Sequence, residues 1–157
     1  MNTAGLLKTE LVKELRLRKF TGVTAEKGLL QGEDQVLVDV YAERNGIMVL
    51  EIEEKRRAPL HNVAKVVRWV SRSQRISKVT MVHIFAQEFY ARKEHRGEEA
   101  LAKFLGNLGH QVLNGRFEYI PLQISMAVNS RSGSARVMVR EIARQIVDTV
   151  SSDPLQK

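Results

Sequence analysis

Apolar residues recur along the chain with two periods, one typical of helices and one typical of strands. From Ala4 to Lys19, three leucines at intervals of four residues predict an amphipathic helix. A polar stretch interrupted by glycines follows and predicts a loop with a short strand near 20–23. Two β-branched apolar runs between 36 and 55 flank Arg44-Asn45-Gly46, so this region is expected to form a β-hairpin.

Helices and strands alternate in the next part of the chain. Valines at helical spacing after Pro59 predict a helix, and the short apolar run Val79–Ala86 predicts a strand buried on both faces. A polar region over 87–97 leads into another predicted helix. The large apolar residues of that helix are Leu101, Phe104, Leu105 and Leu108.

The C-terminal part predicts one more strand and one more helix. The run Phe117–Leu122 is typical of a strand, with Pro121 marking an edge or an end, and Asn114-Gly115 predicts a small hairpin turn before it. After a loop at 129–134, apolar residues at helical spacing predict a helix over about 134–150. The tail 151–157 is expected to fray.

This order of elements predicts a single α/β domain over residues 1–157, with a core over about 4–125. No internal repeat, low-complexity block or long linker divides the sequence. The hairpin is antiparallel, and a helical crossover joins it to the apolar strand, so the sheet is expected to be mixed and flanked by helices.

Composition narrows the classes of function. Without cysteine, the 157-residue chain has no disulfide, thiolate zinc site or cysteine nucleophile. The 25 Lys and Arg against 18 Asp and Glu give a formal net charge of +7, which favours nucleic acid first and an anionic membrane surface second. The N-terminal segment lacks the unbroken apolar stretch of a secretory signal or membrane span, so a cytoplasmic location is expected.

The second strand of the predicted hairpin carries the candidate site. Because side chains alternate along a strand, Glu51 and Glu53 share one face. A two-residue turn pairs Asp39 with Ile52, whereas a three-residue loop with Gly46 in the left-handed conformation pairs Asp39 with Glu51. We favour the second register, because it gathers the three acids on one face. The apolar residues expected together on the other face are Val36, Val38, Val40, Met48, Leu50 and Ile52.

Three carboxylates this close repel one another, and burial raises their pKa values unless a cation neutralises them. An all-oxygen cluster with room for water suits Mg²⁺ or Mn²⁺ rather than zinc. Such an ion orients a phosphodiester and activates water, and a nearby lysine, Lys55 or Lys65, would stabilise the transition state. The alternative is that these glutamates form a solvated, charged outer face.

The spacing of these acids resembles a known family. Asp39, eleven intervening residues and Glu51-Ile-Glu53, followed by a helix and an apolar strand, resemble the core of the PD-(D/E)XK, or restriction-endonuclease-like, nuclease superfamily. The resemblance covers about Leu7–Ala86. It implies a restriction-endonuclease-like α-β-β-α-β core, Mg²⁺-dependent hydrolysis of DNA phosphodiesters and a homodimer.

The resemblance also implies roles for single residues. Asp39 and Glu51 match the metal-binding acids, and Glu53 stands where the superfamily has lysine and would bind metal or position water. That departure implies weakened or lost activity, or a lysine supplied by the next helix, which Lys65 matches. The frame Glu53-Glu54-Lys55 restores an acid-X-lysine match but ranks second, because it pairs Glu53 with Leu37.

A glutamate of the first helix often joins the metal site in this superfamily, and Glu10, or less closely Glu14, matches it. Basic residues after the hairpin predict a surface for DNA phosphates, with a solvated helix face as the alternative. The residues expected to contact DNA are Arg56, Arg57, Asn62, Arg68, Arg72 and Arg75. Lys65, Arg68, Arg72 and Arg75 are spaced to line one helical face.

Trp69 is expected to close the core and His83 to be a hydrogen-bonded core residue. The leading hypothesis is a Mg²⁺- or Mn²⁺-dependent DNA endonuclease that uses Asp39, Glu51 and Glu53. The alternative is a catalytically inactive protein of nuclease fold that acts as a nucleic-acid-binding or assembly module. Duplex, branched, damaged DNA and RNA all remain open as substrates.

Overall fold

The computed structural model describes residues 2–31, 34–55, 58–127 and 134–152. Within them, five strands form one sheet in the order β1-β2-β3-β4-β5. The elements along the chain are α1 (Thr3–Leu17), β1 (Thr21–Gln31), β2 (Asp34–Glu43), β3 (Ile47–Glu53), α2 (Leu60–Arg72), β4 (Val79–Ala86), α3 (Gln87–Tyr90), α4 (Arg96–Val112), β5 (Phe117–Ile124) and α5 (Ala135–Ser151). Neighbouring strands are antiparallel from β1 to β3 and parallel from β3 to β5. The chain is therefore a single α/β domain with a mixed sheet, as the sequence predicts.

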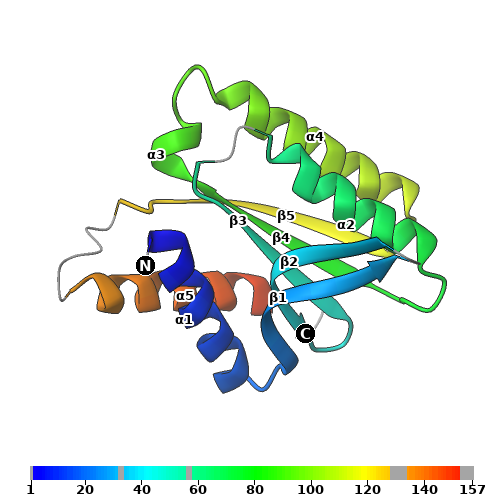
Figure 1. The fold of residues 1–157 in the computed structure, drawn as a ribbon, viewed down its shortest axis with the longest axis horizontal. Helices are drawn as coiled ribbons and strands as arrows, with labels where there is room; N and C mark the ends of the chain where they lie inside the picture. The colour runs from blue at the N-terminus through cyan, green and yellow to red at the C-terminus, as the bar shows by residue number, and fades with distance from the viewer. Residues whose placement is uncertain (1, 32–33, 56–57, 128–133, 153–157) are drawn as a thin grey trace.

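Helices cover both faces of the sheet (Figure 1). Leucines of α1 and apolar residues of α5 pack on one face, around Leu50 and Ile84. Valines and Trp69 of α2 pack on the other face, together with Met81 and Phe85 of β4. β4 lies between β3 and β5 and is buried on both faces, which confirms the sequence prediction for Val79–Ala86. Each fully buried apolar side chain here stabilises the fold by about 1.5–3 kcal/mol.

The stretch expected to be mostly loop forms the long strand β1. Its residues are largely polar and show little alternation, so no strand period marks it in the sequence. Gly22 has a φ of 59° and lies where the register shifts between Thr21 and Thr24, and Gly28 lies within the strand opposite Leu37. The antiparallel part of the sheet is therefore a three-stranded meander rather than a lone hairpin.

The register between β2 and β3 agrees with the three-residue loop. Glu43 pairs with Ile47 and Val40 with Leu50, so one further step in the same register places Asp39 opposite Glu51. The loop itself differs in one detail from the prediction. Asn45 takes the left-handed conformation with a φ of 54°, while Gly46 has a φ of 139°.

The prediction that six apolar residues share one face is wrong for Val36 and Val38. Both pack in the α2 cluster, whereas Val40 packs in the α1 and α5 cluster. The described pairing of β2 with β3 ends at Val40, while β2 continues to pair with β1 as far as Asp34. Beyond Val40 the β1–β2 pair thus lies against α2, and this separation of β2 from β3 leaves room for a pocket.

Several boundaries differ from the sequence predictions. α2 ends at Arg72, so Arg75 lies in the following turn and not on the helical face expected for it. Asn114-Gly115, with positive φ values of 52° and 82°, connects α4 to β5 and does not turn a hairpin. β5 is an edge strand that contains Pro121, as expected.

α4 buries its small residues and exposes most of its large apolar residues. Ala102, Gly106 and Gly109 are buried against the sheet, whereas Phe104 is 66% exposed. A Cβ atom on Gly106 would lie 2.3 Å from the ring of Tyr119, so only glycine fits at this distance. The periodicity of α4 is confirmed, but Leu101, Phe104 and Leu108 are exposed, and of the four large apolar residues that revealed the helix only Leu105 packs against the core.

Candidate functional site

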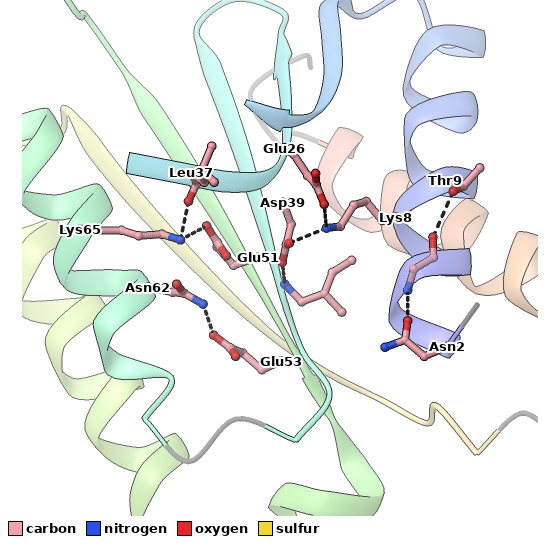
Figure 2. Close-up of polar contacts among 12 residues, drawn as sticks. Asn2, Lys8, Thr9, Glu26, Leu37, Asp39, Glu51, Glu53, Asn62 and Lys65 are labelled. Atoms are coloured by element: carbon pink, nitrogen blue, oxygen red, sulfur yellow. Dashed lines mark hydrogen bonds and ion pairs between the residues drawn. The ribbon is translucent and has the colours of Figure 1, made fainter. Parts of the chain in front are cut away.

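A cavity of about 390 Å³ opens where β2 separates from β3. We call it the acidic pocket. The polar residues that line it are Glu26, Asp39, Glu51, Glu53, Glu54, Asn62 and Lys65. β1, β2, β3 and α2 each contribute side chains, and the close-up in Figure 2 shows that those of Glu51, Glu53, Asn62 and Lys65 point toward one another.

Asp39 is held by the backbone of the neighbouring strand and by a lysine of α1. Its Oδ2 accepts a hydrogen bond from the Ile52 N–H at 2.9 Å. The Nζ of Lys8 lies 2.9 Å from Oδ1 of Asp39 and 3.2 Å from Oε1 of Glu26 (Figure 2). Burial lowers the pKa of Lys8, but these two carboxylates outweigh burial and raise it above its ordinary value. Lys8 is therefore a cation that pairs with two acids of the pocket, and the sequence analysis did not predict this contact.

Glu51 is the acid of the pocket whose pKa is strongly raised. Its side chain is 3% exposed, and the Nζ of Lys65 lies 2.7 Å from its Oε1. Lys65 also donates a hydrogen bond to the Leu37 carbonyl at 2.6 Å. Burial raises the pKa of Glu51 to about 8, Lys65 opposes this rise, and Asp39 adds to it. An additional cation beside Glu51 would stabilise its ionised form.

Glu53 faces the interior of the sheet. Its Oε1 accepts a hydrogen bond from Nδ2 of Asn62 at 2.5 Å and lies 2.9 Å from Nε2 of His83. His83 is fully buried, and its Nδ1 lies 2.9 Å from the hydroxyl of Tyr119. The prediction of a hydrogen-bonded core histidine is thus confirmed. Asn62, predicted to contact DNA, is buried and ties α2 to the end of β3 instead.

The structure does not bring Glu10 to the acidic pocket. Its carboxylate is 2% exposed and lies 2.7 Å from Lys13, 3.5 Å from Arg140 and 3.7 Å from Arg136. Those arginines belong to α5, so the Glu10 carboxylate neutralises their positive charge where α1 packs against α5. The prediction that Glu10 joins Asp39 and Glu51 is therefore not met by this arrangement.

The other predicted cations lie in different places. Lys55 is exposed and lines a separate cavity with Glu88 and Phe89, so Lys65 is the candidate lysine that reaches the acidic pocket. The predicted DNA contacts Arg56 and Arg57 lie outside the described residues.

A second cavity, of about 750 Å³, lies between the β1–β2 pair and the C-terminal half of α2. We call it the basic groove, after its cationic residues Lys27, Arg72 and Arg75. Trp69 forms part of its wall but is only 6% exposed, which confirms its predicted place in the core. Arg68 is exposed on α2 but does not line this groove.

In the part of the chain that the structure describes, no three acidic or histidine side chains form a group that would hold a metal ion. Glu53 is directed to His83 and Asn62, which leaves Asp39 and Glu51 as the pair of hard oxygen donors. Both are carboxylates, the ligand type that Mg²⁺ and Mn²⁺ prefer. The buried Glu51, whose pKa is raised by burial, would gain from a divalent cation.

Among the described helices, none is long and apolar enough to cross a lipid bilayer. No protein-family model, curated protein sequence or solved structure matches this chain. The class that the fold and the site define is therefore a single α/β domain whose mixed sheet carries an acidic pocket beside a basic groove.

Proposed function

We propose that this protein is a Mg²⁺- or Mn²⁺-dependent endonuclease of restriction-endonuclease-like fold that hydrolyses DNA phosphodiester bonds. The observation that carries the proposal is the meeting of Asp39 from β2, Glu51 from β3 and Lys65 from α2 in one open pocket. Two carboxylates and a lysine on these three elements are the arrangement that the resemblance implies. The helical crossover from β3 through α2 to the parallel strand β4 supports the same class.

Asp39 and Glu51 would hold the metal ion. When bound, such an ion supplies Lewis-acid activation of water and of the phosphodiester. The Ile52 N–H fixes the orientation of the Asp39 carboxylate, and Asn62 and Glu53 fix the end of β3 against α2. The ammonium group of Lys65 lies beside Glu51, where it would stabilise the negative charge that develops on a phosphate oxygen.

The charge around the pocket suits a nucleic acid. Arg68 lies one helical turn before Arg72, so it would extend the basic groove into a path for the phosphate backbone. Contacts with phosphates give affinity without sequence preference. Both cavities lie between α2 and the β1–β2 pair, so a strand bound in the groove would lead to the acidic pocket.

Cleavage of a panel of duplex, single-stranded and branched DNA, with RNA alongside, tests the proposal. We expect cutting with Mg²⁺ or Mn²⁺ and none with a chelator. Glu51→Gln and Asp39→Asn should abolish cutting and leave DNA binding within about threefold of the wild type. The matched control is Glu118→Gln, because Glu118 is an acid of β5 that pairs with Lys78 away from the pocket.

Metal binding has its own readout. Mg²⁺ at about 100 times its dissociation constant should raise the free energy of unfolding by about 2.7 kcal/mol. The gain should vanish in Asp39→Asn and persist in Glu118→Gln. Absence of both cutting and metal stabilisation would overturn the proposal.

One observation favours a second candidate, a catalytically inactive protein of nuclease fold that binds nucleic acid or assembles with other proteins. Lys8 and Lys65 already place an ammonium group on Asp39 and Glu51, and Glu53 is occupied by His83. In that case DNA binding would persist, whereas Mg²⁺ would neither stabilise the fold nor start cleavage. The Lys8→Met variant separates the two candidates, since freeing Asp39 should strengthen metal binding only in a metal-dependent protein.

A further inference from the structure

Helices α1 and α5 pack against each other on the face of the sheet opposite α2, and cations gather along their contact (Figure 1). We call Lys13, Arg136, Arg140 and Arg144 the α1–α5 basic surface. Their side chains are exposed by 46%, 65%, 59% and 56%, in that order. The three arginines follow one another at intervals of four residues, so they line one side of α5.

A buried carboxylate lies beneath three of these cations. Glu10 is only 2% exposed. Its oxygens lie 2.7 Å from Nζ of Lys13, 3.5 Å from Nε of Arg140 and 3.7 Å from Nε of Arg136. Burial raises the pKa of Glu10, but Lys13 and Arg140 outweigh burial and lower it below its ordinary value. Three positive charges thus share one negative charge, and a cationic excess remains at the surface.

The contacts with Glu10 leave each guanidinium group able to bind a second anion. Arg140 donates its hydrogen bond to Glu10 through Nε, and the ion pair of Arg136 also runs through Nε. Within the described residues, no hydrogen bond engages the Nη atoms of these two arginines. A guanidinium group presents its N–H donors in a planar fork that matches the oxygens of a phosphate. Glu10 therefore anchors two exposed arginines by one nitrogen each and leaves their other donors for a ligand.

The surroundings of these arginines favour nucleic acid over lipid as the source of the phosphates. A basic helix that binds an anionic membrane inserts its apolar face into the bilayer. The apolar face of α5, which includes Val139 and Ala143, is buried in the core of the domain. Its exposed apolar residues are Val137 and Met138, whereas membrane-binding helices present Trp, Phe and Leu. Arginines that bind only phosphate oxygens suit the backbone of a nucleic acid.

We propose that the α1–α5 basic surface is a second binding surface for nucleic acid, on the face of the sheet opposite the basic groove. The class of partner rests on the proposed function, but binding here requires neither a metal ion nor cleavage. The acidic pocket lies between α1 and α2, since Lys8 and Lys65 each pair with one of its acids. A nucleic acid bound on both surfaces therefore extends to both sides of the pocket.

Fluorescence anisotropy with a duplex of about 30 base pairs, in a chelating buffer that prevents cleavage, tests the proposal. The double variant Arg136→Gln/Arg140→Gln should weaken binding about tenfold and lower the salt slope by about two counterions. The matched control is Arg92→Gln/Arg96→Gln, which removes the same charge from two other exposed arginines four residues apart. It should change neither quantity.

Two further measurements exclude a purely structural effect. Arg136→Lys/Arg140→Lys keeps the charges above Glu10 but loses the planar fork, so it should retain the salt slope and weaken binding about threefold. In the wild type, the backbone amide resonances of 136–144 should shift when the duplex is added, and those of 92 and 96 should not. Adding Arg72→Ala to the glutamine double variant should multiply the separate losses of affinity, as expected for distant sites.

Equal losses in the glutamine double variant and its matched control, or unmoved resonances of α5, would overturn the proposal. So would binding to vesicles of phosphatidylcholine and phosphatidylserine that falls in the double variant while DNA binding does not. Cleavage assays separate this proposal from the nuclease activity. Cutting without these losses of affinity would contradict the second surface alone, and these losses without any cutting would contradict the endonuclease alone.

Discussion

Helices α2 and α4 lie side by side on the same face of the sheet, yet they divide their residues in opposite ways (Figure 1). α2 buries valines and Trp69 and directs Asn62 and Lys65 into the acidic pocket. α4 buries Ala102 and two glycines and exposes Leu101, Phe104 and Leu108. Two neighbouring amphipathic helices can therefore have equal periodicity and opposite orientation.

The difference follows from what each helix packs against. The valine side chains of α2 fill the space between its backbone and strands β3 and β4. In α4, Gly106 lies so close to the ring of Tyr119, and Gly109 so close to Val67 of α2, that neither position has room for a Cβ atom. α2 supports the candidate site with a filled core, whereas α4 leaves Leu101, Phe104 and Leu108 exposed.

Replacing the aromatic residue of each helix should give the largest contrast in stability. Trp69→Ala removes a large buried side chain and should lower the free energy of unfolding by about 3–5 kcal/mol. Phe104→Ala removes a mostly exposed ring and should change it by less than about 0.5 kcal/mol. Urea titration at low micromolar protein measures both. A loss of similar size in the two variants would contradict the opposite orientation of the helices.

The pocket served by α2 should make stability depend on pH. Because burial raises the pKa of Glu51 from 4.5 to about 8, the folded state keeps a proton that the unfolded state releases. Stability should therefore fall as pH rises, by about 3 kcal/mol between about pH 5.5 and 8.5 in a chelating buffer.

Glu51→Gln should remove this fall in stability. The matched control on α4 is Glu99→Gln, since Glu99 is a buried acid that already accepts hydrogen bonds from Gln123. It should keep the wild-type pH dependence. Denaturant titrations at the two pH values measure the free energy of unfolding of each variant. A wild-type free energy that does not change with pH would contradict the raised pKa of Glu51.

Two glycines of α4 should respond in opposite directions to the same substitution. Gly106→Ala forces a Cβ atom against Tyr119 and should lower the free energy of unfolding by about 2 kcal/mol. This value is net of the higher helix propensity of alanine. Gly97→Ala meets no atom within 4 Å and should stabilise by up to about 1 kcal/mol. Thermal and urea unfolding measure the difference. Equal effects at both positions would show that α4 does not approach the sheet this closely.

The smallest expected effect concerns DNA affinity. Arg72→Ala, in the basic groove, should weaken binding about fivefold and reduce the salt slope by about one counterion. Arg96→Ala removes an exposed arginine from the first turn of α4 and should change neither quantity. Fluorescence anisotropy over about 50–200 mM salt makes the comparison. Equal losses of DNA affinity in Arg72→Ala and Arg96→Ala would show that DNA does not bind preferentially along α2.

Local patterns in the sequence were sufficient for part of the fold. The bounds of β4 follow from its apolar run, and the register of β2 with β3 follows from the three-residue loop. β1 was not predicted as a long strand because its residues are mostly polar. It pairs with β2 along its length, and its buried apolar residues Val23 and Leu29 are too far apart to show a strand period. The orientation of α4 could not be predicted, because helical periodicity shows which residues share a face but not which face is buried.

The candidate site was predictable where one further step of the β2–β3 register brings residues together, as for Asp39 and Glu51, which line the same pocket. Lys8 could not be assigned to the pocket, since its contact with Asp39 depends on how α1 lies on the sheet. Glu10 was misassigned for a related reason. Its partners Arg136 and Arg140 belong to the last helix, and no local pattern links them to α1.

The hydrogen bond from the Ile52 N–H to Asp39 gives the pocket a spectroscopic reporter. This amide is bonded to a side chain, so its resonance depends on what else that carboxylate binds. Protonation of Asp39, loss of Lys8 or arrival of a cation should each move the ¹⁵N and ¹H shifts of Ile52 by different amounts. A single peak in a heteronuclear spectrum should thus follow the state of the site during a titration.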